Sequence, residues 1–404
     1  MTRWLSIIGI GEDGLDGLTP AARTLIADAE ILVGGERHHA LVPDHQAERL
    51  TWEVPLARTV ERIGSLRGRR VCVLATGDPQ SYGIGVTLGR HFGRDEMTII
   101  PHLGAFTLAC AGLGWSLHDV TCLTLHGRPA DLINLHVAPD QRLLILSEDA
   151  TTPPLVAQRL TELGYGESRL TVLSRMGGPA ESVVEGTAVG WNANAEIDDL
   201  NTIAIELVAG PDARLVSRIP GLPDDLFDHD GQMTKREVRA ATISALAPAP
   251  GALLWDIGAG SGSIGIEWMR AVDRAEAIAI EPKAERRARI AANASALGAP
   301  RLRILEGKAP AALDGLPAPD AIFIGGGIAA PGVVATAFEA LKPGGRLVAN
   351  AVTLEGEQAM ARYHSTLGGE LVRLNVARLE PVGPYHGWKP LMGVTQWRLE
   401  KSRR

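Results

Sequence analysis

Short apolar runs alternate with longer stretches of mixed apolar and polar residues along the whole chain. A run of this length, bounded by turn residues, is typical of a buried strand, and the stretches between runs are long enough for helices. Alternation of strands with helices predicts an α/β fold with largely parallel sheets. The expected strands are 5–10, 71–75, 97–100, 120–125, 143–146, 170–173 and 202–208, then 252–257, 275–280, 301–305, 320–324 and 346–350.

Helix-start signals and a proline-rich stretch indicate where helices begin and where the chain divides into domains. Thr19-Pro20 is typical of an N-cap followed by proline at the first helical position, which predicts a helix to about residue 29. Thr234 and Glu237 have capping-box spacing, which predicts a helix from 234 to about 247. A chain of 404 residues exceeds one usual core. We therefore predict a first domain over 1–209, a linker rich in proline and glycine over 210–222, and a second domain over 223–404.

Composition argues against several classes of protein, among them nucleic-acid-binding, disulfide-rich and membrane proteins. Residues 1–210 contain 16 arginines, no lysine and 26 acidic residues, which supports the boundary and argues against a nucleic-acid footprint there. The three cysteines are widely spaced, so neither a metal pattern nor a disulfide framework is expected. There is no long apolar run and no signal-peptide pattern at the start. We expect a cytoplasmic protein that makes no contact with membranes.

The richest motif runs from Asp256 through Gly258 and Gly260 to Gly262, between an apolar run and an amphipathic segment. This is a strand, a glycine turn and a helix start, and the free N–H groups of such a turn suit a ligand. Glu281 ends the next apolar run, where a carboxylate can bind both hydroxyls of a ribose. Turns that bind dinucleotides have the sequence G-x-G-x-x-G, whereas the sequence here is D-x-G-x-G-x-G. This spacing resembles the first motif of class I S-adenosylmethionine (SAM) methyltransferases.

Within that class the second domain resembles the precorrin decarboxylating methyltransferases of cobalamin synthesis. The resemblance rests on residues 230–239, on the glycine loop 325–327 after the fourth strand, and on residues 349–355 after the fifth. It implies a Rossmann-like fold with a wide, flat substrate over Gly325 and Gly326. It further implies that Asp256 belongs to the SAM motif and that SAM is held by Thr234, Gly258, Ala259, Gly260, Ser261, Gly262, Glu281, Lys308 and Ala309. The family often has Asp where this chain has Lys308.

The first domain carries a second series of loop motifs after its apolar runs. These are residues 9–14, 74–79 with 82–83, 101–107, and 125–128. Together they resemble the tetrapyrrole methylases, a class III SAM fold, and most closely the branch that methylates precorrin at carbon 5. The resemblance implies that Gly9 and Gly11 face the tetrapyrrole. It also implies that SAM is bound by Gly77, Asp78, Pro79, Ala105 and Phe106.

One departure concerns the first loop. The family commonly has Gly-Pro-Gly-Asp there, whereas this chain has Gly11-Glu12-Asp13-Gly14, so the resemblance gives no specific catalytic carboxylate in the loop.

Polar residues near these motifs suggest how an anionic substrate is held. Lys235 and Arg239 are four residues apart on the predicted helix, so we expect one face to hold substrate carboxylates, with Lys235 a candidate catalytic residue. His126 and Arg128 are the corresponding candidates in the first domain, because histidine titrates near neutrality and arginine pairs with carboxylates. No metal ligand is expected.

The two resemblances together imply a bifunctional enzyme. They imply SAM-dependent methylation of a precorrin at carbons 5 and 15, with decarboxylation of the ring C acetate, from precorrin-6B to precorrin-8. The implied partners are one SAM per domain, an anionic tetrapyrrole and further copies of the chain in a homo-oligomer. Two alternatives stay open: a nicotinamide-dependent reductase using the 256–262 turn, and an enzyme in which one domain only captures the tetrapyrrole.

Overall fold

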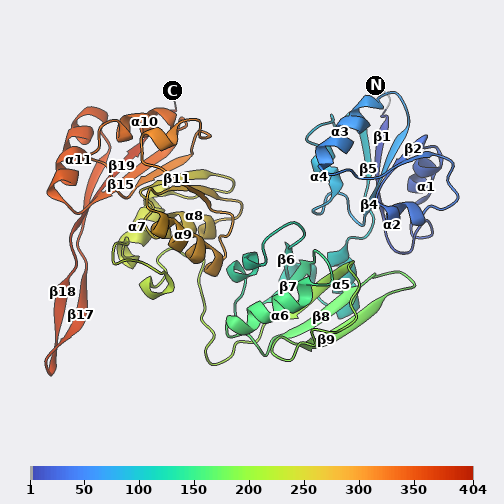
Figure 1. The fold of residues 1–404 in the computed structure, drawn as a ribbon, viewed down its shortest axis with the longest axis horizontal. Helices are drawn as coiled ribbons and strands as arrows, with labels where there is room; N and C mark the ends of the chain where they lie inside the picture. The colour runs from blue at the N-terminus through green and yellow to red at the C-terminus, as the bar shows by residue number, and fades with distance from the viewer. Residues whose placement is uncertain (1–2, 404) are drawn as a thin grey trace. The chain divides into compact units, whose positions relative to one another are not determined.

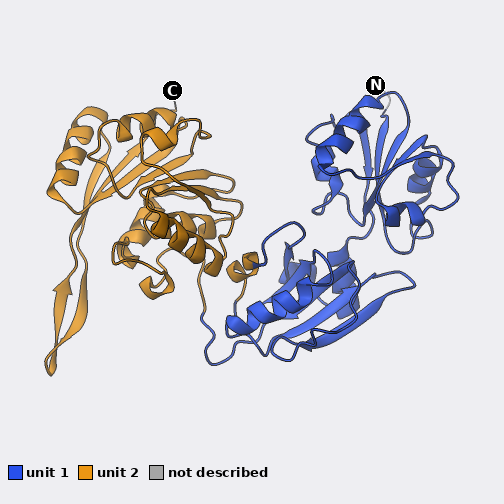
Figure 2. Cartoon of the chain, in the orientation of Figure 1, with its two compact units in different colours: residues 1–130, 138–214 blue, residues 131–137, 215–404 orange. Residues whose placement is uncertain are grey.

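The computed structural model describes residues 3–403, and the chain folds into two compact units (Figures 1 and 2). Unit 1 comprises residues 1–130 and 138–214, and unit 2 comprises residues 131–137 and 215–404. The second unit is therefore discontinuous in sequence. Within residues 3–403, no helix combines the length and the apolar character needed to cross a membrane.

Unit 1 begins with a parallel five-stranded sheet of order β3-β2-β4-β1-β5. Helix α1 packs on one face, while α3 and α4 pack on the other, and the central strands β2, β4 and β1 are almost fully buried. The elements are β1 (Leu5–Ile10), α1 (Pro20–Ala27), β2 (Ile31–Val33), α2 (Glu36–Ala40), β3 (Glu48–Leu50), α3 (Leu56–Ser65), β4 (Val71–Thr76), α4 (Ile84–Leu88) and β5 (Met97–Ile100).

A second sheet of order β6-β7-β10-β8-β9 completes unit 1. Among the neighbouring strand pairs of this sheet, only β6–β7 is parallel. This corrects the prediction of largely parallel sheets for this part of the chain. The reason is that β8 is followed by the hairpin strand β9 instead of a crossover helix, and β10 then inserts antiparallel between β7 and β8. The elements are α5 (Ala105–Leu113), β6 (Thr121–Thr124), β7 (Arg142–Leu146), α6 (Thr152–Glu162), β8 (Arg169–Ser174), β9 (Ser182–Thr187) and β10 (Asn201–Glu206).

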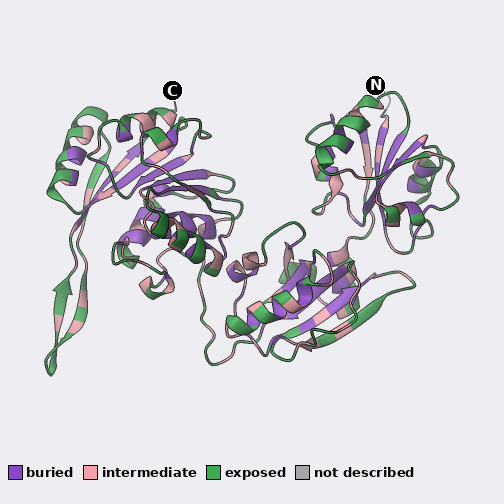
Figure 3. Cartoon of the chain, viewed as in Figure 1, coloured by how far each residue is buried: buried purple, intermediate pink, exposed green. Residues whose placement is uncertain are grey.

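Unit 2 is a three-layer sandwich around a seven-stranded sheet of order β13-β12-β11-β14-β15-β19-β16. Helices α7, α8 and α9 cover one face, and α10 and α11 cover the other. The strands in the centre of the sheet are buried along their length (Figure 3). The elements are α7 (Arg236–Leu246), β11 (Leu253–Ile257), α8 (Ser263–Ala271), β12 (Glu276–Ile280), α9 (Ala284–Ala296), β13 (Arg303–Leu305), β14 (Ala321–Ile324), α10 (Val333–Ala340), β15 (Arg346–Ala351), α11 (Leu354–Leu367), β16 (Glu370–Leu374) and β19 (Val394–Glu400).

Two features of unit 2 lie outside this sandwich. Strands β17 (Ala377–Val382) and β18 (Tyr385–Pro390) form an exposed two-stranded ribbon that projects from the unit (Figures 1 and 3). The other feature is the segment 131–137, which caps the end of α9. There the Asn134 side-chain amide donates to the carbonyls of Ser295 and Ala296, at 3.0 and 3.2 Å.

The two predicted helix starts have different outcomes. The prediction at Thr19 is confirmed, because its hydroxyl accepts a hydrogen bond from the backbone N–H of Ala22. The helix predicted from Thr234 is present, but its predicted start and capping box are wrong. Helix α7 begins at Arg236 with Lys235 as N-cap, and no side chain makes a cap hydrogen bond there. The backbone carbonyl of Thr234 instead accepts a hydrogen bond from Arg239, so the residue belongs to the segment leading into the helix.

Candidate functional site

The clearest candidate site lies at the carboxyl ends of the parallel strands of unit 2. Gly258, Gly260 and Gly262 all have φ between 60° and 77°, a region that side chains rarely adopt. A Cβ on Gly258 would meet the backbone nitrogen of Gly326 at 3.0 Å. The turn after β11 therefore passes so close to the loop after β14 that glycine is required, and it leads directly into α8.

Glu281 fixes this turn. Its side chain is almost fully buried, and its two carboxylate oxygens accept from the backbone N–H groups of Gly260 and Lys283 at 3.0 and 3.1 Å. The residue stands where β12 ends, beside the turn after β11, because these two strands are parallel neighbours. A carboxylate held in this way keeps lone pairs that can receive the hydroxyls of a ribose.

Asp256 lies behind the turn and does not line the cavity. It is fully buried, and one carboxylate oxygen accepts from the backbone N–H of Gly265 at 3.0 Å. The other oxygen has no hydrogen-bond partner among the described residues. Burial raises the pKa of Asp256 to about 7, opposed by the Gly265 hydrogen bond and reinforced by Glu281. A cation bound nearby would favour the ionised form.

A cavity of about 960 Å³ opens over these strand ends. This volume is at the upper end of the range for small-molecule sites and leaves room beside a nucleoside. The sequence-predicted residues that line it are Thr234, Lys235, Gly258, Ala259, Gly260, Ser261, Glu281, Lys308, Ala309, Gly325 and Gly326. The hydroxyl of Ser261 is buried and has no partner within the described chain, so the turn carries an uncommitted polar atom.

Arg239 corrects one of our predictions. Its side chain is fully buried and does not line the cavity, whereas Lys235 does. Arg239 donates to Glu267 at 2.6 Å and to Asp224 at 3.1 Å, and it also bonds two backbone carbonyls. Because these contacts use its donors inside the protein, it anchors the segment before α7 instead of meeting a substrate carboxylate.

The segment before α7 forms one wall of the cavity. Its residues 231–235 line the cavity beside the glycine turn. Arg286 on α9, which also lines the cavity, holds this segment by donating to Asp230 at 2.8 Å and to Gln232 at 2.6 Å. The sequence motif 230–239 is thus a wall held by a buried arginine and a half-exposed one.

The cavity also has a side away from the glycine turn. Asn350, Thr353 and Glu355 line it there, and none of them is a residue to which the sequence analysis gave a role. The Asn350 amide donates to Thr242 at 2.9 Å and accepts from the fully buried Gln396 at 3.0 Å, which fixes its orientation. The alternation of apolar and polar residues gave no signal for this network, because its members lie on three different elements.

The predicted residues of unit 1 gather at the ends of β1, β4 and β5. Gly77 donates to the carbonyl of Ile10 at 3.0 Å, and His102 donates to the carbonyl of Gly77 at 3.2 Å. A Cβ on Gly9 would lie 1.9 Å from that same carbonyl oxygen, so glycine is required. The loops at Gly9, Gly77 and His102 are therefore in direct backbone contact.

Two more of the predicted segments reach this place from the second sheet of unit 1. Phe106, in the first turn of α5, makes an edge-on contact with Tyr82, with ring centroids 6.2 Å apart. The guanidinium of Arg128 lies 5.3 Å from the centroid of the Tyr82 ring. Tyr82, which the sequence analysis quoted only within a motif, thus connects the expected SAM and substrate segments. Ala105 begins α5, and Asp78 caps its own turn by accepting from Gln80.

The side chain of His126 is exposed to solvent. Its side chain is 72% exposed, and its Nδ1 lies 3.4 Å from the Glu148 carboxylate. Glu148 also accepts from the backbone N–H of Gly127. The carboxylate therefore holds the loop that follows β6.

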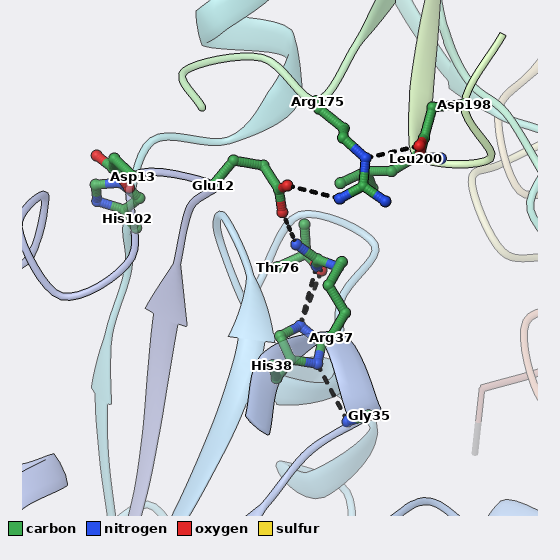
Figure 4. Close-up of polar contacts among 10 residues, drawn as sticks. All are labelled: Glu12, Asp13, Gly35, Arg37, His38, Thr76, His102, Arg175, Asp198 and Leu200. Carbon is green, nitrogen blue, oxygen red and sulfur yellow. Dashed lines mark hydrogen bonds and ion pairs between the residues drawn. The ribbon is translucent and has the colours of Figure 1, made fainter. Parts of the chain in front are cut away.

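A chain of ionic contacts joins elements of unit 1 that are far apart in sequence (Figure 4). Glu12 pairs with Arg37 from α2 and with Arg175 from the turn after β8, the latter at 3.0 Å. Arg175 also pairs with Asp198 at 2.6 Å. Neither arginine carries a sequence signal, because each lies outside the glycine motifs. In residues 3–403, no group of three or more His, Cys, Asp or Glu side chains is arranged to hold a metal ion.

Comparisons with known proteins find two different families along this chain. A family model described as tetrapyrrole (corrin/porphyrin) methylases matches residues 5–189. A second, described as a precorrin methyltransferase domain, matches residues 225–401. A Rhodobacter capsulatus crystal structure, the C-terminal domain of a precorrin-6Y C5,15-methyltransferase, is 46% identical, with a TM-score of 0.44, and covers 46% of this chain and 100% of that one.

Two curated relatives match nearly the whole chain, and both are named precorrin-6Y C(5,15)-methyltransferase [decarboxylating]. The one from Sinorhizobium sp is 50% identical over 400 residues, covering 99% of this chain and 97% of its own. The one from Mycobacterium tuberculosis is 41% identical over 399 residues, covering 98% and 99%. The nicotinamide alternative is thereby set aside in favour of SAM as methyl donor. The chain belongs to the decarboxylating precorrin-6Y C(5,15)-methyltransferase family, which methylates precorrin in cobalamin biosynthesis.

Proposed function

We propose that each unit binds its own SAM and carries out one of the two methylations. Unit 2 methylates carbon 15 and removes carbon dioxide from the ring C acetate, and unit 1 methylates carbon 5. The observation that carries this proposal is that one chain contains two unlike sets of strand-end loops, each within the range of a different family model. The substrate is the cobalt-free precorrin-6B, and the product is precorrin-8.

The SAM site of unit 2 is supported by how well its residues suit the molecule. The glycine turn leaves backbone N–H groups and the Ser261 hydroxyl beside the cavity, and Glu281 supplies a carboxylate for the ribose. Lys308 and Ala309 lie in the same wall, where the adenine would rest. Bound there, SAM supplies an electrophilic methyl group on a sulfonium. The protein's contribution to methyl transfer is alignment, since an in-line displacement needs no covalent nucleophile.

The remainder of the cavity suits a flat polyanion. Gly325 and Gly326 leave space over the sheet, and Lys235 supplies a cation in the lining of the same cavity. Asn350 lines the cavity with an amide of fixed orientation. We propose that Lys235 pairs with a substrate carboxylate and stabilises charge that develops on the ring, which itself accepts the electrons released by decarboxylation.

In unit 1 we propose that SAM lies between the loop at Gly77, Asp78 and Pro79 and the first turn of α5 with Ala105 and Phe106. The N-terminus of this nine-residue helix provides N–H groups beside that loop. The tetrapyrrole then meets Gly9, Gly11 and Arg128. His126 stays a candidate proton acceptor, and Arg128 is the better supported residue of the two because its guanidinium lies against the Tyr82 ring.

We also propose that the protein is a cytoplasmic homo-oligomer, and the exposed ribbon supports the assembly. Leu379 and Trp388 are directly opposite in the β17–β18 register, on one face, and are 53% and 73% exposed. Lys389 and Glu380 pair at 2.8 Å on the other face. A second copy offers the same apolar face for symmetric pairing. Light scattering should give a multiple of the chain mass that Trp388→Glu reduces.

The test of the two-site proposal uses the full chain. Equilibrium dialysis should find two S-adenosylhomocysteine molecules per chain, and mass spectrometry should find two methyl groups gained and one carbon dioxide lost. Glu281→Ala should reduce binding to one molecule and slow the carbon 15 step about 100-fold or more, because the turn and the ribose both lose their acceptor. Glu285→Ala, four residues further on α9, is the matched control.

Other outcomes would contradict parts of this proposal. A single binding site in the unmodified chain would indicate that one unit only captures the tetrapyrrole. Loss of carbon 5 methylation in Glu281→Ala, with carbon 15 methylation retained, would reverse the assignment of the two units.

A further inference from the structure

The ionic chain in unit 1 leaves one hydroxyl group with a proton to donate. That hydroxyl belongs to Thr76, the last residue of β4, which directly precedes the SAM loop at Gly77 (Figure 4). Two groups contact its Oγ1: a terminal nitrogen of Arg37, and His38 Nε2 at 3.0 Å. Which of these contacts are donations to Thr76 decides where its own proton can go.

The tautomer of His38 follows from its second ring nitrogen. The backbone N–H of Gly35 donates to His38 Nδ1 at 3.2 Å, so Nδ1 carries a lone pair. Burial, with the neighbouring Arg37 charge, lowers the pKa of His38 to about 4, so the ring is neutral at neutral pH. A neutral ring with an accepting Nδ1 has its proton on Nε2. His38 Nε2–H therefore donates to Thr76.

Thr76 Oγ1 then accepts twice, once from His38 and once from Arg37. A hydroxyl has two lone pairs and one proton, so both acceptor positions are used. The Thr76 proton is directed away from both donors, and no described residue accepts it. The Thr76 side chain is exposed, in contrast to the five preceding residues of β4, which are buried. Its remaining donor therefore faces a place that a ligand can reach.

Arg37 contributes further donors at the same place. Its guanidinium has five N–H groups, and one terminal nitrogen contacts Glu12 while the other contacts Thr76. The remaining N–H groups make no hydrogen bond with the described residues. The contact between Arg37 and His38 Nε2 at 3.2 Å is not a hydrogen bond, because both atoms carry protons. Arg37 and Thr76 together thus present donors and no free acceptor.

The neighbouring carboxylates hold Arg37 in place. Glu12 is only 10% exposed and lies between Arg37 and Arg175, so its charge is shared by two guanidiniums. Gly178 lies against it so tightly that a Cβ there would be 2.4 Å from the Glu12 Cβ. Asp198 balances Arg175. The charges of the two carboxylates and the two guanidiniums therefore sum to zero. No bound anion is needed to balance them, and Arg37 keeps donors that are free to bind a ligand.

We propose that Thr76 and Arg37 form a carboxylate-binding subsite of unit 1, with Glu12 and His38 as its positioning residues. A carboxylate is the group that matches a hydroxyl donor beside a guanidinium. The inference rests on the proposed function, in which both ligands of unit 1 carry carboxylates. One source is the methionine part of SAM, and the other is a side chain of the tetrapyrrole.

The test compares Thr76→Val with Thr76→Ser in the full chain. Thr76→Val removes the hydroxyl at nearly constant volume and should lower kcat/KM for carbon 5 methylation about ten-fold or more, as expected for a lost hydrogen bond to a charged group. Thr76→Ser should stay within about three-fold of the unmodified chain. Carbon 15 methylation by the same molecules serves as the internal control, and Thr98→Val on β5 is the matched variant.

Binding measurements in the Glu281→Ala background identify the source of the carboxylate. If it comes from SAM, Thr76→Val weakens S-adenosylhomocysteine binding but leaves 5′-methylthioadenosine, which lacks the amino acid part, unchanged. If it comes from the tetrapyrrole, binding of both nucleosides is unchanged and KM for the precorrin rises. Either pattern supports the subsite.

Two results would be adverse, and they have different meanings. Equal carbon 5 methylation in Thr76→Val and the unmodified chain would overturn the subsite. An effect confined to carbon 15 methylation would overturn the assignment of the units and not the presence of a subsite at Thr76. Glu12→Gln adds a test of positioning: it should raise KM for the same ligand as Thr76→Val, with kcat retained, and a change in thermal stability alone would contradict that role.

Discussion

The candidate sites of the two units are built by different means. In unit 2 the cavity is lined by loops that directly follow parallel strands, and the turn after β11 is held by Glu281 and shaped by three left-handed glycines. In unit 1 the strand-end loops also meet through their backbones, but ion pairs from Glu12 to Asp198 add side chains from segments next to two different sheets. A site made by a continuous turn keeps its geometry through local hydrogen bonds, whereas a site made by distant side chains needs long-range ion pairs to position it.

The charged networks of the two units differ in the same way. Arg239 in unit 2 is fully buried with Glu267, while Arg175 in unit 1 is 32% exposed. A buried ion pair that loses one partner leaves an unpaired charge in a medium of low dielectric, and a half-exposed pair is relieved by water. The following predictions test whether this difference governs stability and pH dependence.

The largest effect is expected for Arg239→Ala, which leaves Glu267 buried without its cation. We expect unit 2 to lose about 3–5 kcal/mol of unfolding free energy. Hydrogen exchange at the amides of β11 and β12 in urea would measure this within the unit. Arg175→Ala, the matched change in unit 1, should cost about 1 kcal/mol or less in β1 and β4. Equal losses in the two units would contradict the comparison.

A smaller effect is expected from His38, which stays neutral in the folded protein. Because burial and Arg37 lower its folded pKa to about 4 from 6.5, only the unfolded chain gains a proton as the pH falls below 6.5. The stability that unit 1 has above pH 6.5 is therefore lost on acidification, by about 2 kcal/mol at pH 5. His38→Gln should flatten that dependence. The measurement is the unfolding midpoint of unit 1 at several pH values between 7 and 5. If the midpoint of the variant changed with pH as steeply as that of the unmodified chain, His38 would be excluded as the cause.

The smallest effect concerns the methyl donor in unit 2. Burial raises the pKa of Asp256 to about 7, so binding of a sulfonium cation should release its proton. We expect the preference for SAM over the uncharged S-adenosylhomocysteine to increase by up to about ten-fold between pH 6 and 8. Calorimetry in buffers of different ionisation enthalpy measures the released proton. Asp256→Asn should abolish the pH dependence, and its persistence would point to another group.

These contrasts also explain what could be predicted from the sequence. The strands at the centre of each sheet were recognisable because they are buried on both faces and read as continuous apolar runs. Strand β2 is apolar but only three residues long, too short to stand out. Strand β3 and the ribbon β17–β18 contain polar residues and gave no such run. The antiparallel second sheet of unit 1 was missed because apolar runs do not encode strand direction.

The residues of the candidate sites can be divided in the same way, into those that follow a strand directly and those that do not. Gly258, Glu281 and Gly325 could be predicted because each follows a strand directly, and parallel strands bring their ends together. Arg239 looked like a surface cation because helical spacing alone does not tell which face is buried. Arg37 and Arg175 could not be found, since their partner Glu12 is 25 and 163 residues away in sequence.

The segment 131–137 has a consequence for dissecting the gene. The polypeptide passes from unit 1 into unit 2 at residue 131, returns at 138, and enters unit 2 again at 215. A truncation at the linker therefore separates Asn134 from the carbonyls of Ser295 and Ala296, which close the last turn of α9. Helix α9 also carries Arg286, which holds the cavity wall. A fragment that begins at residue 215 would therefore lack the contacts that close the end of α9. Inactivating point substitutions are the sounder way to silence either half.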